Sequence, residues 1–79
     1  MIVEIITPEK NIFKGEASLI QLPGIDGSFE VLSNHAPMIS VLKKGRIKVK
    51  IEPEQKETFF EINGGVIEVL KNKVLVLAE

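Results

Sequence analysis

The strict alternation of apolar and charged residues in Arg46–Glu52 is the feature that most constrains the fold. Ile47, Val49 and Ile51 alternate with basic residues and one glutamate. Successive side chains of a strand point to opposite faces, so one face of this segment would meet a core and the other would meet water. The basic face has two interpretations. We favour a solvated face, the usual fate of charged strand positions, over a basic stripe that contacts a partner.

Turn signals divide the rest of the chain into short segments of the same kind. Asn63-Gly64-Gly65 separates two apolar runs and predicts a hairpin, because Asn and Gly accept the positive φ angles of tight turns. Pro53-Glu54-Gln55-Lys56 is polar and predicts another hairpin tip. No window has helical periodicity, so an all-β sandwich or barrel is expected. Further strands are predicted at Ile2–Thr7, Ser18–Leu22, Pro37–Leu42, Thr58–Ile62, Val66–Leu70 and Lys73–Ala78.

Size and composition exclude several classes of protein. A chain of 79 residues predicts one domain, residues 1–79, and the absence of cysteine excludes disulfides and thiolate metal sites. The net charge of -1 argues against a nucleic-acid partner, which clustered Lys and Arg would bind. No apolar run reaches the about 18 residues that span a bilayer. The N-terminus has no basic segment of the kind that opens a secretory signal, so we expect none.

The stretch Gly27–Pro37 is the strongest candidate for a functional surface. It crosses a short apolar run and ends in a loop that holds the only histidine, His35. Loops on a rigid β scaffold commonly carry function. A Ser-His-Asp set can be written from Ser33, His35 and Asp26, but no nucleophile elbow or other motif supports it. We therefore expect no catalytic residue and no metal or cofactor site, and we expect His35 to shape its loop or lie at an interface.

The four phenylalanines, the only aromatic residues, leave one question open. Phe59 and Phe60 are adjacent, so their rings must point to opposite faces of a strand. One ring belongs to the core, and the other either fills the far layer or lies at an interface. An RNA-binding barrel would expose aromatic rings beside a basic groove, so that function is a minor alternative here.

An ordered set of motifs runs along nearly the whole chain. The motifs are Thr7-Pro8-Glu9, Phe13-Lys14-Gly15-Glu16-Ala17, Leu22-Pro23-Gly24, Asp26-Gly27, Asn34-His35-Ala36-Pro37-Met38-Ile39, Leu42-Lys43-Lys44-Gly45, Gly64-Gly65-Val66-Ile67-Glu68-Val69 and Val74-Leu75-Val76-Leu77-Ala78-Glu79. In their order and spacing they resemble the N-terminal β-sandwich domain of the epsilon subunit of F-type ATP synthases. The chain has Glu30 and Ser33 where that family commonly has Gly and Pro before the Asn-His pair.

The resemblance implies a fold and a role. The fold would be a two-sheet β-sandwich of about eight to ten short, mostly antiparallel strands. The role would be that of a central-stalk rotor subunit that couples rotation of the c-ring to gamma and the catalytic hexamer, driven by protons or sodium ions. The subunit would be non-catalytic and would lie peripherally on the cytoplasmic face of the bacterial inner membrane, inside the complex. The alternative is a stand-alone β-domain that binds a protein or a ligand.

The same resemblance implies which residues touch the partners. Ser28, Phe29 and Glu30 would contact the polar loops of the c-ring, and His35 would lie near its junction with gamma. The apolar face toward gamma would take residues from the first and last strands and from the loop Asn34–Ile39. The family usually continues into two helices after the segment that ends at Glu79. We expect a naturally short subunit that lacks the inhibitory hairpin and does not bind ATP.

Overall fold

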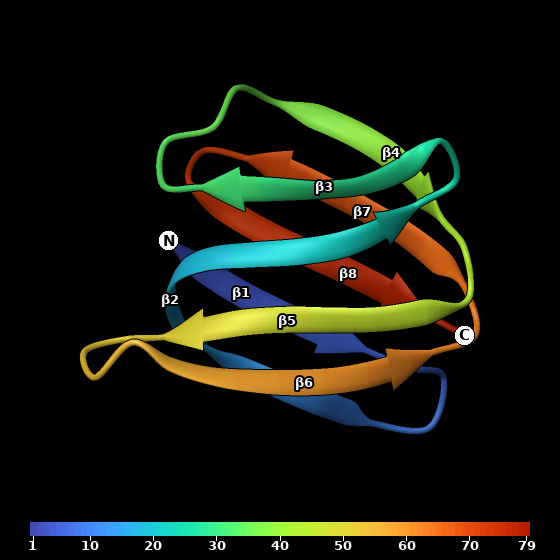
Figure 1. The fold of residues 1–79 in the computed structure, drawn as a ribbon, viewed down its shortest axis with the longest axis horizontal. Coiled ribbons are helices and arrows are strands. Elements are labelled where there is room, and N and C mark those ends of the chain that lie inside the picture. Colours follow the sequence, from blue (N-terminus) through green and yellow to red (C-terminus); the bar gives the residue numbers. More distant parts are fainter.

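The computed structural model describes all of residues 1–79 and consists of eight strands without a helix (Figure 1). The prediction of an all-β fold is therefore confirmed, and the structure holds no helix that could span a membrane. The strands are β1 (Ile2–Ile6), β2 (Asn11–Gly24), β3 (Gly27–Leu32), β4 (Met38–Leu42), β5 (Gly45–Ile51), β6 (Lys56–Ile62), β7 (Gly65–Leu70) and β8 (Lys73–Ala78).

The strands form two layers joined by the long strand β2. The first part of β2 pairs with β1, and its second part pairs with β3 and β5. Figure 1 shows β3, β2, β5 and β6 in the front layer, with β1, β8 and β7 behind them. Strand β4 extends the back layer from β7. All pairs are antiparallel except β1 with β8, so the expected sandwich of mostly antiparallel strands is confirmed.

Strand β2 differs from the sequence prediction, which placed a strand only at Ser18–Leu22. The observed strand has 14 residues and passes through Pro23 to Gly24. Its first part contains Lys14, Gly15 and Glu16, which weaken the apolar signal, but cross-strand pairing with β1 holds it extended. The carbonyl of Pro23 accepts a hydrogen bond from the amide of Lys43 at 2.9 Å, so this proline takes part in the sheet as an acceptor.

The core lies between the layers and follows the alternation predicted from the sequence. Ile47 and Val49 of β5 are fully buried, as are Val3 and Ile5 of β1. Sixteen buried apolar residues form one cluster, and no buried polar side chain lacks a partner. A close-packed interior of this kind resists deformation and transmits force.

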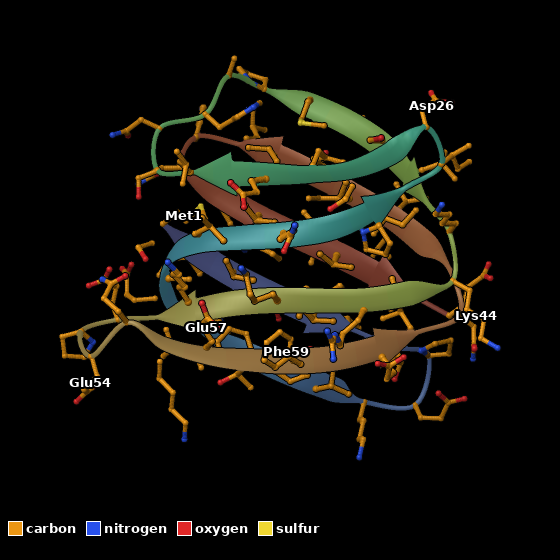
Figure 2. The ribbon with its side chains drawn as sticks, in the orientation of Figure 1. Met1, Asp26, Lys44, Glu54, Glu57 and Phe59 are labelled. Carbon is orange, nitrogen blue, oxygen red and sulfur yellow. The ribbon has the colours of Figure 1, made fainter.

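The outer face of β5 and β6 bears on two questions raised by the sequence: the environment of the basic residues and the orientation of the adjacent phenylalanines. Phe60 packs against the core and lies 5.5 Å from Phe13 between ring centroids, whereas Phe59 is 46% exposed on the front face (Figure 2). The guanidinium of Arg46 stacks 4.6 Å above the Phe59 ring, and Lys48 lies 3.9 Å from the Glu57 carboxylate. Arg46 and Lys48 of the basic face are thus each paired with a side chain of β6, as expected for a solvated, internally paired face.

Candidate protein-interaction site

The four predicted contact residues do not form one cluster. Ser28 and Glu30 point outward from β3, opposite Pro23 and Gln21 of β2. The side chain of Gln21 donates a hydrogen bond to the Ser28 hydroxyl at 3.1 Å. Phe29 lies between them in the sequence and therefore points to the other side of the strand, where it is half-buried against the core. Ser28 and Glu30 share a surface, and Phe29 does not belong to it.

His35 lies beyond the C-terminal end of β3, in the loop that leads to β4. Its Nδ1 is 2.7 Å from the carbonyl oxygen of Ala36, and because a carbonyl only accepts, Nδ1 donates. The amide of Asn34 donates to Oδ1 of Asn72 at 2.8 Å, which ties this loop to the turn between β7 and β8. The structure therefore places His35 in a loop held by local hydrogen bonds, as the sequence suggested.

The structure does not bring Ser33, His35 and Asp26 together as a Ser-His-Asp set. Asp26 lies in the turn between β2 and β3, at one end of β3 (Figure 2), while Ser33 and His35 follow its other end. A strand of six residues separates them, about 20 Å at 3.3 Å per residue. No three His, Asp or Glu side chains gather as metal ligands either.

Strands β4, β7 and β8 of the back layer (Figure 1) carry a broad apolar surface on their outer side. We call it the apolar face. Ile39 pairs with Glu68 across β4 and β7, Val41 pairs with Val66, and Val66 pairs with Leu77 on β8. The most exposed member is Ile39, at 72%. The apolar face comprises the exposed or half-buried residues Ile39, Val41, Val66, Leu70, Leu75 and Leu77, with Glu68 among them.

Contiguous exposed apolar surfaces commonly mark interaction sites, which makes the apolar face the candidate interaction site of this chain. Its rim is polar: Lys73 at the start of β8 lies 3.8 Å from the Glu4 carboxylate of β1. A shallow hollow lies between Ile39 and Val41 of β4 and the β2–β3 turn. Ile25 and Phe29 also line it. Phe29 is therefore accessible from the side of β4 and not from the surface that carries Ser28 and Glu30.

The sequence contained a signal for this surface. In β7 and β8, apolar residues occupy consecutive positions, as in Val74-Leu75-Val76-Leu77, whereas β5 alternates apolar with charged residues. A strand with apolar residues on both faces is covered on both faces in its working state. The sequence analysis expected an apolar surface from the first and last strands and the loop Asn34–Ile39. Strand β8 and Ile39 do belong to the apolar face, whereas β1 and the rest of that loop contribute no member to it, and β7 was not expected.

The tie between Asn34 and Asn72 allows a local test. Lys71 and Asn72 both have positive φ, 51° and 61°, as the two-residue hairpin turn requires. Asn72→Gly keeps this backbone accessible and removes the acceptor for Asn34. We expect faster amide hydrogen exchange at Asn34 and His35, with a change in unfolding free energy below about 1 kcal/mol. Unchanged exchange at Asn34 would show that the side-chain tie does not order the loop.

A family model and the curated relatives of this chain agree on one protein family. The model of the family described as "ATP synthase, Delta/Epsilon chain, beta-sandwich domain" matches residues 1–79. The ATP synthase epsilon chain of Chlorobium limicola is 38% identical over 77 residues, which cover 98% of this chain and 86% of that protein. The ATP synthase epsilon chain of Neisseria meningitidis strain FAM18 is 37% identical over 79 residues. There the chain spans only 56% of the relative's length.

Solved structures show the same fold. A chain of the central stalk and c-ring of the Tetrahymena thermophila mitochondrial ATP synthase superposes with a TM-score of 0.82, at 24% identity over 99% of this chain and 62% of that one. A chain of the Euglena gracilis mitochondrial ATP synthase superposes with a TM-score of 0.91, also at 24% identity, over 99% of this chain and 49% of that one. These structures agree in fold, and the family model with the bacterial relatives shows that this chain belongs to the epsilon-chain family of ATP synthases and spans its β-sandwich domain.

Proposed function

We propose that this chain is a rotor subunit of the central stalk of a proton- or sodium-translocating F-type ATP synthase. In this role it couples rotation of the c-ring to gamma and the catalytic hexamer, and it performs no chemistry itself. Membership of the epsilon-chain family supports the proposal, as does the likeness to chains from central-stalk and c-ring assemblies. Its place is at the cytoplasmic face of the bacterial inner membrane, held there by the complex.

The apolar face is the observation that carries the proposal. A subunit that transmits torque must bind its partner over a large, well-packed area and must not deform. The molecule measures 28 × 25 × 19 Å between Cα extremes, and its sheets lie across the shortest axis (Figure 1). The area of one broad side is therefore similar to the surface that each partner buries in a stable interface, about 800 Å². Gamma binds this face in our proposal.

The polar front of β3 leaves a second surface free for the c-ring. Ser28 and Glu30 lie on the front layer, whereas the apolar face lies on the back layer, so two partners can bind at once. The loop with His35 adjoins the β7–β8 turn through Asn72 and lies at the border of the two surfaces. Phe29 supports β3 from inside the sandwich and reaches a partner only through the hollow beside Ile39.

Co-purification tests this function. The chain is co-expressed with its cognate gamma subunit and then added to the assembled c-ring, and each step is followed by size-exclusion chromatography. We expect a stable complex with gamma and tighter ring binding by that complex than by gamma alone. Glu30→Gln should leave gamma binding unchanged and weaken ring binding by at most about fivefold, because an exposed ion pair contributes about 0 to 1 kcal/mol. A chain that stays free of gamma would indicate a stand-alone β-domain and contradict the proposal.

A further inference from the structure

Glu68 is the one charged residue within the apolar face. It is exposed on β7, with Ile39 of β4 directly opposite on one side and Leu75 of β8 directly opposite on the other. Val66 and Leu70 flank it along its own strand on the same face. Three separate shallow hollows of this face each include Glu68 in their walls. The carboxylate thus lies at the centre of the apolar face, and one of these hollows reaches Lys71 and Lys73 at the rim.

This carboxylate has no cation within its own chain. The ion pairs of the structure join the N-terminus to Glu16, Lys48 to Glu57 and Lys73 to Glu4, and none includes Glu68. Lys73 stands diagonally across β8 from Glu68, but its ammonium lies 3.8 Å from Glu4 at the rim. No hydrogen bond to the Glu68 side chain is formed either. In the free chain, water satisfies this carboxylate.

An apolar partner that covers this face removes that water. A desolvated carboxylate without a counter-charge is strongly unfavourable, so any stable cover must bring a donor group to Glu68. A guanidinium is the best fit, because it tolerates burial better than an ammonium and binds a carboxylate through two parallel hydrogen bonds.

We propose that the apolar face binds an apolar protein surface that presents a single basic side chain, preferably arginine, to Glu68. This inference rests on the proposed function and names the chemistry that gamma must offer at its contact with this chain. Glu68 is then the residue that sets register and partner choice, while the surrounding aliphatic side chains supply the buried area.

A second copy of the chain fits this face less well. A symmetric dimer uses the same patch on both molecules, so a two-fold axis through the centre of the patch would bring one Glu68 close to the other. Two like charges in an apolar interface repel, which disfavours self-association. The charge pattern of the face therefore selects a partner of opposite charge at its centre.

The experiment measures affinity for the cognate gamma subunit by isothermal titration calorimetry. Wild type is compared with Glu68→Gln, Glu68→Lys and the control Glu61→Gln, an exposed glutamate on β6 of the other layer. We expect Glu68→Gln to weaken binding by about 30-fold or more, the loss that follows removal of one partner of a buried charge pair. Glu68→Lys should abolish detectable binding, and Glu61→Gln should bind within about twofold of wild type. Thermal unfolding of the free variants checks that all remain folded.

Three outcomes would overturn the inference. If Glu68→Gln binds gamma as tightly as Glu61→Gln, gamma binding stands and the central charge pair is wrong. If the wild-type chain forms no gamma complex, the proposed function fails together with this inference. If the wild-type chain alone sediments as a dimer that Glu68→Lys leaves intact and Ile39→Asp dissociates, the cover is a second copy and not a basic partner surface.

Discussion

Ile39→Asp should abolish the complex with gamma while leaving the isolated chain folded. Ile39 is 72% exposed, so the free protein loses little buried apolar area when this side chain is shortened. In the complex, the change removes an aliphatic contact of about 1.5 to 3 kcal/mol and buries a carboxylate directly opposite Glu68. Both effects act against binding, and we expect affinity to fall by at least about 100-fold, as measured by calorimetry.

Phe59→Asp provides the matched control for Ile39→Asp. Phe59 is also an exposed apolar residue in a strand, at 46%, but it lies on the front layer under Arg46. Its replacement loses a cation–π contact of about 0.5 to 1 kcal/mol and should leave gamma affinity within about twofold. Urea unfolding followed by circular dichroism verifies that both variants fold. Equal losses of gamma affinity from the two variants would show that the apolar face is not the specific contact.

The fold was predictable wherever local pattern and tertiary partner agree. Strand β5 alternates apolar and charged residues, and the structure buries Ile47 and Val49 as that pattern requires. The first part of β2 was not predicted, because Lys14-Gly15-Glu16 carries little apolar signal and becomes a strand through pairing with β1. That pairing joins Lys14 to Glu4 and Glu16 to Ile2, residues 10 and 14 positions apart, which local periodicity does not detect.

The candidate site was predictable only in part, for a geometric reason. The stretch Gly27–Pro37 is continuous in sequence, yet strand alternation turns Phe29 away from Ser28 and Glu30, and the length of β3 separates them from His35.

The apolar face is the converse case, because its residues are far apart in the sequence and adjacent in the sheet. Its members come from β4, β7 and β8, and only the register shows that Ile39, Glu68 and Leu75 lie in one row. A glutamate inside an apolar run is visible in the sequence, but only the assembled sheet shows that it forms no ion pair and that Lys73 pairs with Glu4 instead.

Gly65→Ala should produce the largest loss of stability among surface-accessible positions. Gly65 opens β7 with a φ of 150°, a conformation that residues with a Cβ rarely adopt. A Cβ at this position would overlap the carbonyl oxygen of Leu77 and would stand 3.0 Å from the Cα of Ala78, both backbone atoms of β8. We expect the unfolding free energy to fall by about 2 to 4 kcal/mol, from backbone strain together with displacement of the paired strand.

Gly27→Ala separates these two causes. Gly27 has a φ of 131° in the β2–β3 turn, but a Cβ there would meet no atom within 4 Å. This variant therefore bears the backbone strain alone, about 1 to 2 kcal/mol. The chain has no Trp or Tyr, so circular dichroism in urea is the suitable measurement for both variants.

The unfolding free energy that Gly65→Ala loses beyond the loss in Gly27→Ala measures how tightly β7 must approach β8. Because these strands carry Val66, Glu68 and Leu77, that variant should also weaken gamma binding, whereas Gly27→Ala should not. Equal losses in the two variants would mean that backbone strain accounts for the whole effect and that β8 can move away from β7 freely.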